Sequence, residues 1–147
     1  MEKPFAGLKI KWPDIPAILE ELAERQKPKI VYIAHQIAGD ITGNRDAILK
    51  ICKEIHTREI LPCAPCLLFL EYLDDSIPKE RELGMLANRK YFQQGIINEL
   101  WLCGPRISDG MKEEIALALK HHIPIKCHNP ALQLDLGRII EEWKKTK

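Results

Sequence analysis

The chain has 147 residues, of which 46% are hydrophobic and 29% are charged, and its formal net charge is +1. This composition is too apolar for a disordered chain and fits one domain, and a charge near zero argues against a polymeric nucleic acid or an anionic membrane as partner. No apolar run approaches the roughly 20 residues of a membrane-spanning helix, and the segment 1–11 lacks the apolar core of a signal peptide. The five cysteines, an odd number, fit a reducing compartment. We therefore expect a cytoplasmic protein.

Segments with helical and strand patterns alternate along the chain. The segment 29–34 (KIVYIA) is typical of a buried strand, and Ile15, Ile18 and Leu19 recur at helical spacing. The expected elements, in chain order, are a helix over 13–26, a strand over 29–34, a helix over 45–58, a strand over 59–63, a short helix or irregular segment over 67–75, a helix over 78–94, a strand over 99–103, a helix over 110–121, a strand over 123–127 and a helix over 130–145.

This alternation predicts βαβ units and an α/β fold with a parallel sheet of four to five strands. Residues 1–28 are expected to be a leader and a helix, and residues 29–147 a single domain. Ligands of such sheets bind beyond the carboxyl ends of the strands. Three loops should meet there, over 35–44, 62–75 and 104–110.

The first of these loops carries His35, Gly39 and Asn44 ahead of a helix. Backbone amides at a helix start can hold a phosphate or a carboxylate. The loop is neither a Walker loop nor a GxGxxG fingerprint. The alternative interpretation is an ordinary turn in which Thr42 or Asn44 caps the helix.

The third loop brings Ser108, Asp109 and Gly110 to the start of another helix, with Glu114 about one turn further along. A half-buried carboxylate at this point can act as a nucleophile or as an acid or base. The alternative is that Ser108 and Asp109 are caps and that Glu113 and Glu114 are first-turn acids favoured by the helix dipole.

Three segments in order carry a resemblance to a known family: LPCAPC at 61–66, DDSIPKER at 74–81 and SDGMKEE at 108–114. Together they resemble the nucleoside 2-deoxyribosyltransferase-like superfamily, and within it an uncharacterised bacterial and phage branch. The resemblance covers roughly residues 29–128. It implies a three-layer fold of the flavodoxin or Rossmann type and a homo-oligomer that binds a nucleoside or nucleotide, with 67–72 as an interface segment. We expect no cofactor and no metal.

The resemblance also implies roles for single residues. Glu114 matches the glutamate that attacks the anomeric carbon of the sugar while the base leaves, and Ser108 and Gly110 match positions that bind the sugar phosphate in related hydrolases. Cys66 stands where the branch has histidine, and Asn98 where many relatives have aspartate. We therefore take Asp75 as the second catalytic residue, chosen from Asp74, Asp75 and Glu80. The expected ligand-binding residues are His35, Gly39, Asn44, Arg81, Ser108, Asp109, Gly110 and Met111.

The charged segment around Asp75 also has a simpler interpretation, in which Asp75 or Ser76 caps the next helix and Glu80 and Arg81 form a solvated face. Arg81 would otherwise neutralise a phosphate.

The cysteines offer a different kind of site. Cys63 and Cys66 form a CxxC motif after a strand, as in thioredoxin-type redox pairs. Cys127 and His128 end another strand and would complete a Cys3His zinc site with them.

Three hypotheses follow from these patterns. The first is an N-glycosidic-bond hydrolase or deoxyribosyltransferase with Glu114 as nucleophile. The second is a non-catalytic module of the same fold that binds a nucleotide-like ligand. The third is a thiol-redox or zinc protein.

Overall fold

The computed structural model describes residues 13–24 and 27–147. Its elements are α1 (Ile15–Glu24), β1 (Lys29–Ala34), α2 (Ile41–Ile55), β2 (Ile60–Cys63), α3 (Pro65–Tyr72), α4 (Pro78–Gln93), β3 (Glu99–Leu102), α5 (Asp109–Lys120), β4 (Ile125–Cys127), the 3-10 turn η1 (Pro130–Leu132) and α6 (Gln133–Lys145). The expected order of elements is confirmed for the described part of the chain, and the expected helix over 130–145 is divided into η1 and α6. Among the described residues, no helix has both the length and the hydropathy to cross a bilayer.

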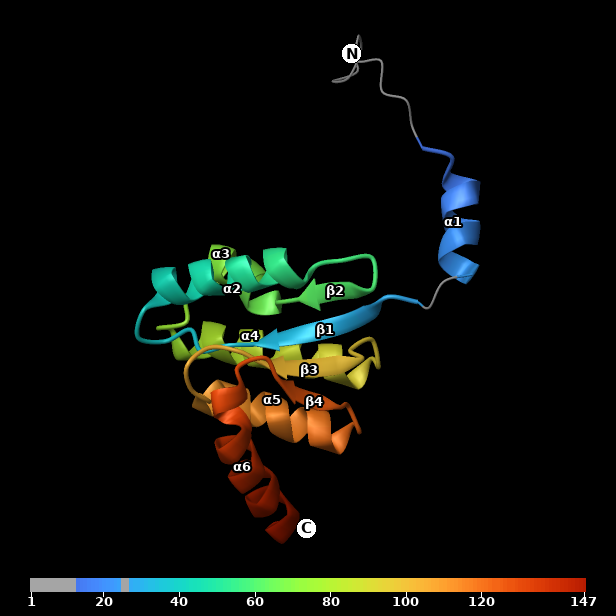
Figure 1. Cartoon of the computed structure of the whole chain (residues 1–147). Helices are drawn as coiled ribbons and strands as arrows, with labels where there is room; N and C mark the ends of the chain where they lie inside the picture. The colour runs from blue at the N-terminus through green and yellow to red at the C-terminus, as the bar shows by residue number, and fades with distance from the viewer. Residues whose placement is uncertain (1–12, 25–26) are drawn as a thin grey trace, which may run out of the picture.

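The four strands form one parallel sheet in the order β2-β1-β3-β4 (Figure 1). The α/β fold with a parallel sheet is therefore confirmed, with four strands among the described residues. From β1 the chain goes to β2 on one side and then to β3 on the other, so the direction of winding reverses between β1 and β3. The carboxyl ends of these two strands mark the point at which α/β sheets bind ligands.

Two apolar clusters cover the two faces of the sheet. On one face Tyr32 and Leu100 pack with Phe92 of α4 and with Met111 and Ile115 of α5. On the other face the cluster consists of Val31, Ile33 and Cys103 packed against Ile48 and Ile55 of α2. In Figure 1, α2 lies next to β2 and α5 next to β4. Burial on both faces explains why 29–34 is a nearly continuous apolar run.

Side-chain caps place the starts of two helices. Asp40 accepts a hydrogen bond from Gly43 N at 3.0 Å and caps α2, which therefore begins at Ile41 and not at Arg45. The interpretation of Thr42 or Asn44 as the cap is wrong, because both lie inside the helix. Ser108 caps α5 by accepting from Met111 N at 3.4 Å.

The start of α4 differs from the expectation. Ile77 is the N-cap and makes no side-chain cap, so neither Asp75 nor Ser76 caps this helix. Pro78 occupies the first turn, where its missing N–H costs nothing and its fixed φ suits a helix. Ser76 instead donates its N–H to Asp74 Oδ1 at 2.9 Å, which forms a turn ahead of the helix.

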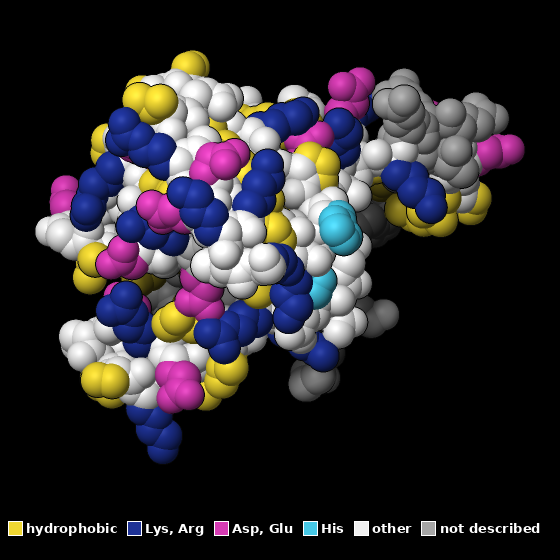
Figure 2. Space-filling view, turned by 90° about the horizontal axis from the view of Figure 1, so that it is seen from below, with side chains coloured by type: hydrophobic (Ala, Val, Ile, Leu, Met, Phe, Trp, Pro, Cys, Tyr) yellow, Lys and Arg dark blue, Asp and Glu magenta, His cyan; other side chains and the backbone are white. Residues whose placement is uncertain are grey.

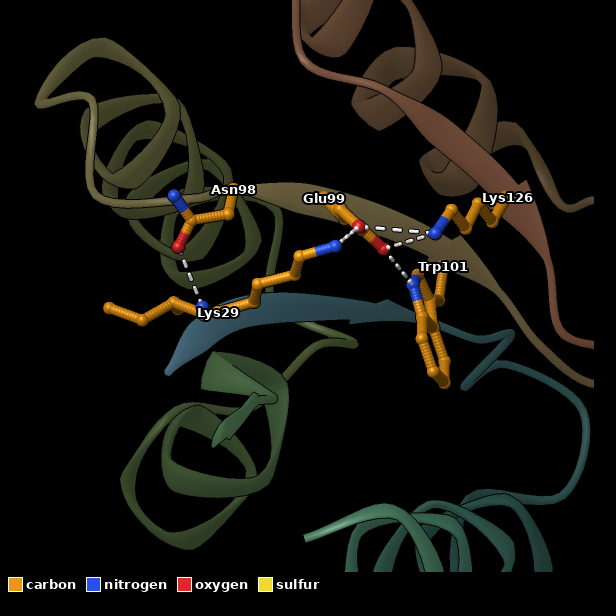
Figure 3. A network of polar contacts seen from close by, with 6 residues as sticks. Lys29, Asn98, Glu99, Trp101 and Lys126 are labelled. Atoms are coloured by element: carbon orange, nitrogen blue, oxygen red, sulfur yellow. Dashed lines mark hydrogen bonds and ion pairs between the residues drawn. The ribbon is translucent and has the colours of Figure 1, made fainter. Parts of the chain in front are cut away.

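Glu99, at the start of β3, is the centre of a polar network that joins three strands (Figure 3). Its carboxylate accepts hydrogen bonds from Lys29 Nζ at 2.8 Å, Trp101 Nε1 at 2.8 Å and Lys126 Nζ at 3.1 Å. Burial acts to raise the pKa of this carboxyl group, but these hydrogen bonds prevail and hold the pKa at about 2. The two lysines that cover the carboxylate are more than half exposed, so the network lies close to the surface.

Replacing Glu99 with glutamine should lower the free energy of unfolding by roughly 2 kcal/mol at pH 7, because Lys29 and Lys126 lose the carboxylate that they share. The folded-state pKa lies below the ordinary value of 4.5. The contribution is therefore present above about pH 4.5 and is lost as the pH falls toward 2. Urea unfolding at pH 7 and pH 3 measures this, and the gap between wild type and variant should shrink by about half at pH 3.

Glu54→Gln is the matched control, since Glu54 is an exposed residue of α2 in an i,i+4 pair with Lys50. Its effect should be small at both pH values. An undiminished gap for Glu99→Gln at pH 3 would contradict the ionic origin of the stabilisation.

Candidate functional site

A cavity of about 590 Å³ opens at the carboxyl ends of β1 and β3. Its walls come from the loop after β1, from α3, from the segment 73–81 with the first turns of α4, and from the loop after β3 with the start of α5. The three loops expected to meet at this end of the sheet therefore do so. The volume falls within the range of small-molecule sites.

Glu114 lies in the wall of this cavity, one turn into α5. Its carboxyl Oε1 accepts a hydrogen bond from the Tyr32 hydroxyl at 2.8 Å. The carboxyl group is surrounded by protein, and the residue as a whole is half-buried, with part of its surface facing the cavity. Desolvation raises its pKa to about 8, the hydrogen bond from Tyr32 acts in the opposite direction, and the neighbouring Glu113 raises it further. Glu114 is therefore mainly protonated at neutral pH in the unliganded protein.

Glu113 also lines the cavity but has a different partner. Arg89 of α4 donates from Nε to Glu113 Oε1 at 2.8 Å, and a second guanidinium nitrogen reaches the same oxygen. This ion pair joins α4 to α5 beside Glu114. The two adjacent carboxyl groups thus have separate environments, one deep and bonded to a phenol, the other partly exposed and paired with a cation.

Tyr32 is one of the residues of this site that the sequence alone did not predict. It is almost fully buried, and its ring packs on Phe92 with the ring centroids 4.9 Å apart. Burial, followed by the charge of Glu114, raises its pKa well above the usual 10. A single phenol in the otherwise aliphatic run 30–34 was the available signal, because a buried tyrosine hydroxyl needs a hydrogen-bond partner.

The first loop contributes His35 to the cavity, but not Gly39 or Asn44. His35 is buried, with its Nδ1 2.7 Å from Gln36 O. Asn44 is buried inside α2 and donates from Nδ2 to Ile37 O at 3.0 Å, so it supports the loop from behind. Gly39 has a φ of +98°, which explains glycine at this turn.

The other predicted residues lie around the mouth and wall of the cavity. Asp75 and Arg81 both line it, are exposed, and face each other with 4.0 Å between Asp75 Oδ1 and Arg81 Nε. The third loop and the start of α5 bring the remaining predicted residues to the lining: Ser108, Asp109, Gly110 and Met111.

Arg106 lines the cavity as well and was not predicted. It donates from Nε to Gln36 Oε1 at 2.6 Å, which ties the third loop to the first. The remaining N–H groups of such a guanidinium are suited to an anion. In Figure 2, Lys and Arg side chains are interspersed with Asp and Glu side chains at the end of the molecule where the strands finish.

The cysteines do not assemble a metal site. Cys63 and Cys127 end β2 and β4, which are the outermost strands on opposite sides of the sheet. Three strand spacings, about 14 Å, separate such strands, and the described residues contain no group of three or more potential metal ligands. The alternative Cys3His arrangement is therefore not formed among these residues. Cys66 lines the cavity, and burial, with the charge of Glu114, raises its thiol pKa to about 12. A redox cysteine normally has a lowered pKa.

Residues 29–128 match the model of a family described as a domain of unknown function, DUF7768. The match begins with β1 and ends just after β4, so it includes the whole sheet and the lining of the cavity. No curated protein and no solved structure matches the chain significantly.

The raised pKa of Glu114 makes a testable link between pH and stability. The folded protein holds a proton on Glu114 up to about pH 8, whereas the unfolded chain releases it near the ordinary value of 4.5. The stability due to this group is therefore fully present below pH 4.5 and is lost as the pH rises toward 8. Between pH 5 and pH 9 the wild type should lose roughly 3 kcal/mol relative to Glu114→Gln, whose side chain does not titrate.

Urea unfolding of both proteins across this pH range measures the difference. Glu113→Gln is the control, because it removes the neighbouring carboxyl group and leaves Glu114 in place; it should keep most of the wild-type pH dependence. Parallel stability curves for the wild type and Glu114→Gln would contradict a buried, protonated Glu114.

Proposed function

Because the chain belongs to the DUF7768 family, whose function is unknown, its activity has to be argued from its own residues, and we propose that it cleaves the N-glycosidic bond of a nucleoside or nucleotide. Glu114 is the nucleophile, and the reaction is hydrolysis or transfer of the sugar to a second base. The observation that carries the proposal is the carboxyl group of Glu114, held by the Tyr32 hydroxyl in the wall of a cavity of suitable size.

The chemistry needs one carboxylate against the anomeric carbon. Glu114 first gives its proton to water in the cavity and becomes a carboxylate. As the bond from that carbon to the base nitrogen breaks, the sugar gains oxocarbenium character, and the Glu114 oxygen bonds to the carbon to form a glycosyl ester. The bonding electrons leave with the base, which takes up a proton. Water or a second base then attacks the same carbon and releases Glu114. The Tyr32 hydroxyl fixes the direction of the carboxyl group in both steps.

The proton for the departing base is assigned to Asp75. It lies at the mouth of the same cavity, beside Arg81. Arg81 and Arg106 are the arginines among the lining residues, and either can neutralise a phosphate on the sugar. Ser108 and Gly110 lie at the start of α5 beside them, where the helix dipole favours an anion. This combination favours a nucleoside monophosphate over an uncharged nucleoside.

A second function, ligand binding without turnover, is favoured by a different observation. With its pKa near 8, Glu114 is mainly protonated at neutral pH, and a protonated carboxyl group donates a hydrogen bond but is a poor nucleophile. A module of this kind would hold a nucleotide-like ligand in the same cavity. The two functions differ in whether any base is released.

We also propose that the protein forms a homo-oligomer, with α3 in the interface. Leu68 and Tyr72 occupy one side of this helix, four residues apart, and both are largely exposed. α3 forms part of the cavity wall through Phe69 and Leu70, so a subunit packed here would lie beside the site.

The first measurement is base release from a panel of ribo- and deoxyribonucleosides and their 5′-monophosphates, followed by chromatography. The wild type should release a base from at least one member. Glu114→Gln should lower the rate by at least about 10³-fold, because the glycosyl ester cannot form. Glu113→Gln, which changes the adjacent carboxyl group, should keep most of the activity.

Each result has a distinct meaning. Release that survives in Glu114→Gln would contradict the nucleophile. No release, together with a rise in melting temperature on adding a panel member, would establish the binding module and remove the enzyme. Neither release nor a shift would overturn both functions.

The pH profile of the reaction tests the role of Tyr32. Glu114 must be ionised to attack, so kcat/KM should rise with pH through about 8 in the wild type. Tyr32→Phe removes the hydrogen bond that lowers this pKa, so the rise should move to higher pH. Tyr91→Phe, at a tyrosine of α4 that does not line the cavity, is the control and should leave the profile unchanged. A Tyr32→Phe profile that overlays the wild type would refute the contact as a determinant of ionisation.

A further inference from the structure

One half of one face of the sheet has no helix over it among the described residues. Trp101 of β3 and Lys126 of β4 are partners in the register and therefore point to the same side. This is the side that α2 covers over β1 and β2. Over β3 and β4, however, Trp101 stays partly exposed, and Lys126 and His128 are exposed. Parallel sheets are normally covered on both faces, so we expect another segment of protein to pack on this area.

We use the name open strip for the uncovered area together with Lys29, the exposed first residue of β1. Its other members lie in or just after β3 and β4: Glu99, Trp101, Lys126 and His128. Its middle is flat and aromatic, because the Trp101 and His128 rings stack with their centroids 5.7 Å apart and an interplanar angle of 13°. Two lysines surround the single carboxylate of Glu99, which leaves an excess of positive charge (Figure 3). Both lysine side chains are more than half exposed and have donors left for further partners.

α1 has the complementary surface. Ile15, Ile18 and Leu19 form an apolar face at helical spacing, their exposed fractions are 51%, 38% and 61%, and they belong to neither core cluster. The segment 14–24 contains four acidic residues and no basic one. An apolar helix face with acidic flanks matches a flat aromatic surface with basic flanks, both in apolar area and in sign of charge.

The sizes of the two surfaces also agree. The ten residues of α1 extend about 15 Å, and a strand of four residues such as β3 extends about 13 Å. Two strands are about 10 Å wide, close to the diameter of one helix with its side chains. One helix laid along the open strip would therefore cover it.

The α1 of the same chain is at the wrong side of the sheet for this. Glu21 Oε1 lies 3.8 Å from Nη1 of Arg58, and Arg58 comes just before β2 in the chain. β2 is the edge strand of the sheet opposite β4 (Figure 1). We propose that the protein forms a symmetric dimer in which α1 of each protomer packs on the open strip of the other. A twofold axis makes both contacts at once, since each chain carries one helix and one strip. This interface is separate from α3 and does not depend on the proposed function.

Zero-length carbodiimide cross-linking of full-length protein tests the contact directly, because the reagent joins a lysine amine to a carboxylate in contact with it. We would cross-link a one-to-one mixture of unlabelled and nitrogen-15-labelled protein and analyse the peptides by mass spectrometry. Cross-links should join the segment 14–24 to Lys29 or Lys126, and about half of them should be between labelled and unlabelled chains. If every cross-link joined two peptides that carry the same label, the packing of α1 on the open strip of the partner would be refuted.

Sedimentation equilibrium of variants gives the second readout. The double variant Ile18→Asp/Leu19→Asp should weaken dimerisation by at least about 100-fold, because it replaces two apolar side chains that the dimer interface would bury with charged ones. Both residues are exposed in the single chain, so its fold should be kept, as measured by circular dichroism. Leu134→Asp, at an exposed leucine of α6, is the control and should dimerise as the wild type does. The proposal would be refuted if the wild type sediments as a monomer at about 100 micromolar, a concentration at which even a weak interface of this kind should form. It would also be refuted if the double variant dimerises as strongly as the wild type.

Discussion

A sheet of parallel strands is normally covered on both faces, and this constraint places the other elements of the molecule. α2 satisfies it on one side of β1 and β2, and α4 and α5 satisfy it on the other side. The same arrangement creates the cavity. The chain leaves the carboxyl end of β1 toward one side of the sheet and the carboxyl end of β3 toward the other, and a crevice remains where the strand order reverses. Coverage that stops short of β3 and β4 on one face produces the open strip.

Two carboxyl groups show how strongly the surroundings decide the charge state. Glu99 and Glu114 are both covered by protein, but Glu99 has two ammonium groups and an indole N–H around it, and its pKa falls to about 2. Glu114 has one neutral phenol and a neighbouring carboxyl group, and its pKa rises to about 8. Desolvation acts to raise both values, so the difference comes from the partners. The first group is suited to holding strands together, and the second to a change of charge during binding or reaction.

The sequence was sufficient for the elements whose pattern is local. The apolar run 29–34 forms the strand that was predicted. Ser108, one of the two capping residues considered for α5, is its cap. Glu114 was named because it lies about one turn into the predicted helix and because it matches the nucleophilic glutamate of the family that the sequence resembles. The α2 cap was missed because Asp40, Thr42 and Asn44 are all acceptable capping residues, and only the path of the loop selects Asp40.

Contacts between distant residues were beyond local patterns. The hydrogen bond from Tyr32 to Glu114 joins positions 82 residues apart. It depends on α5 covering the same face of the sheet to which Tyr32 of β1 points. Likewise, the exclusion of Gly39 and Asn44 from the cavity follows from the early start of α2, which turns Asn44 inward. The zinc arrangement failed for a related reason. Ends of parallel strands share an edge of the sheet, but the strand order decides whether they are neighbours.

The protonated state of Glu114 bears directly on how a nucleophile can work in this cavity. A charge-free carboxyl group lets an uncharged or anionic ligand enter without electrostatic opposition at the reacting centre. In the proposed reaction the sugar gains positive charge, which would stabilise an adjacent carboxylate and lower its pKa. Ionisation and bond breaking then favour each other, while the phenol of Tyr32 keeps a hydrogen bond to the group in either charge state. A pKa above neutrality in the empty cavity is therefore compatible with catalysis, provided that the proton leaves Glu114 before its oxygen bonds to carbon.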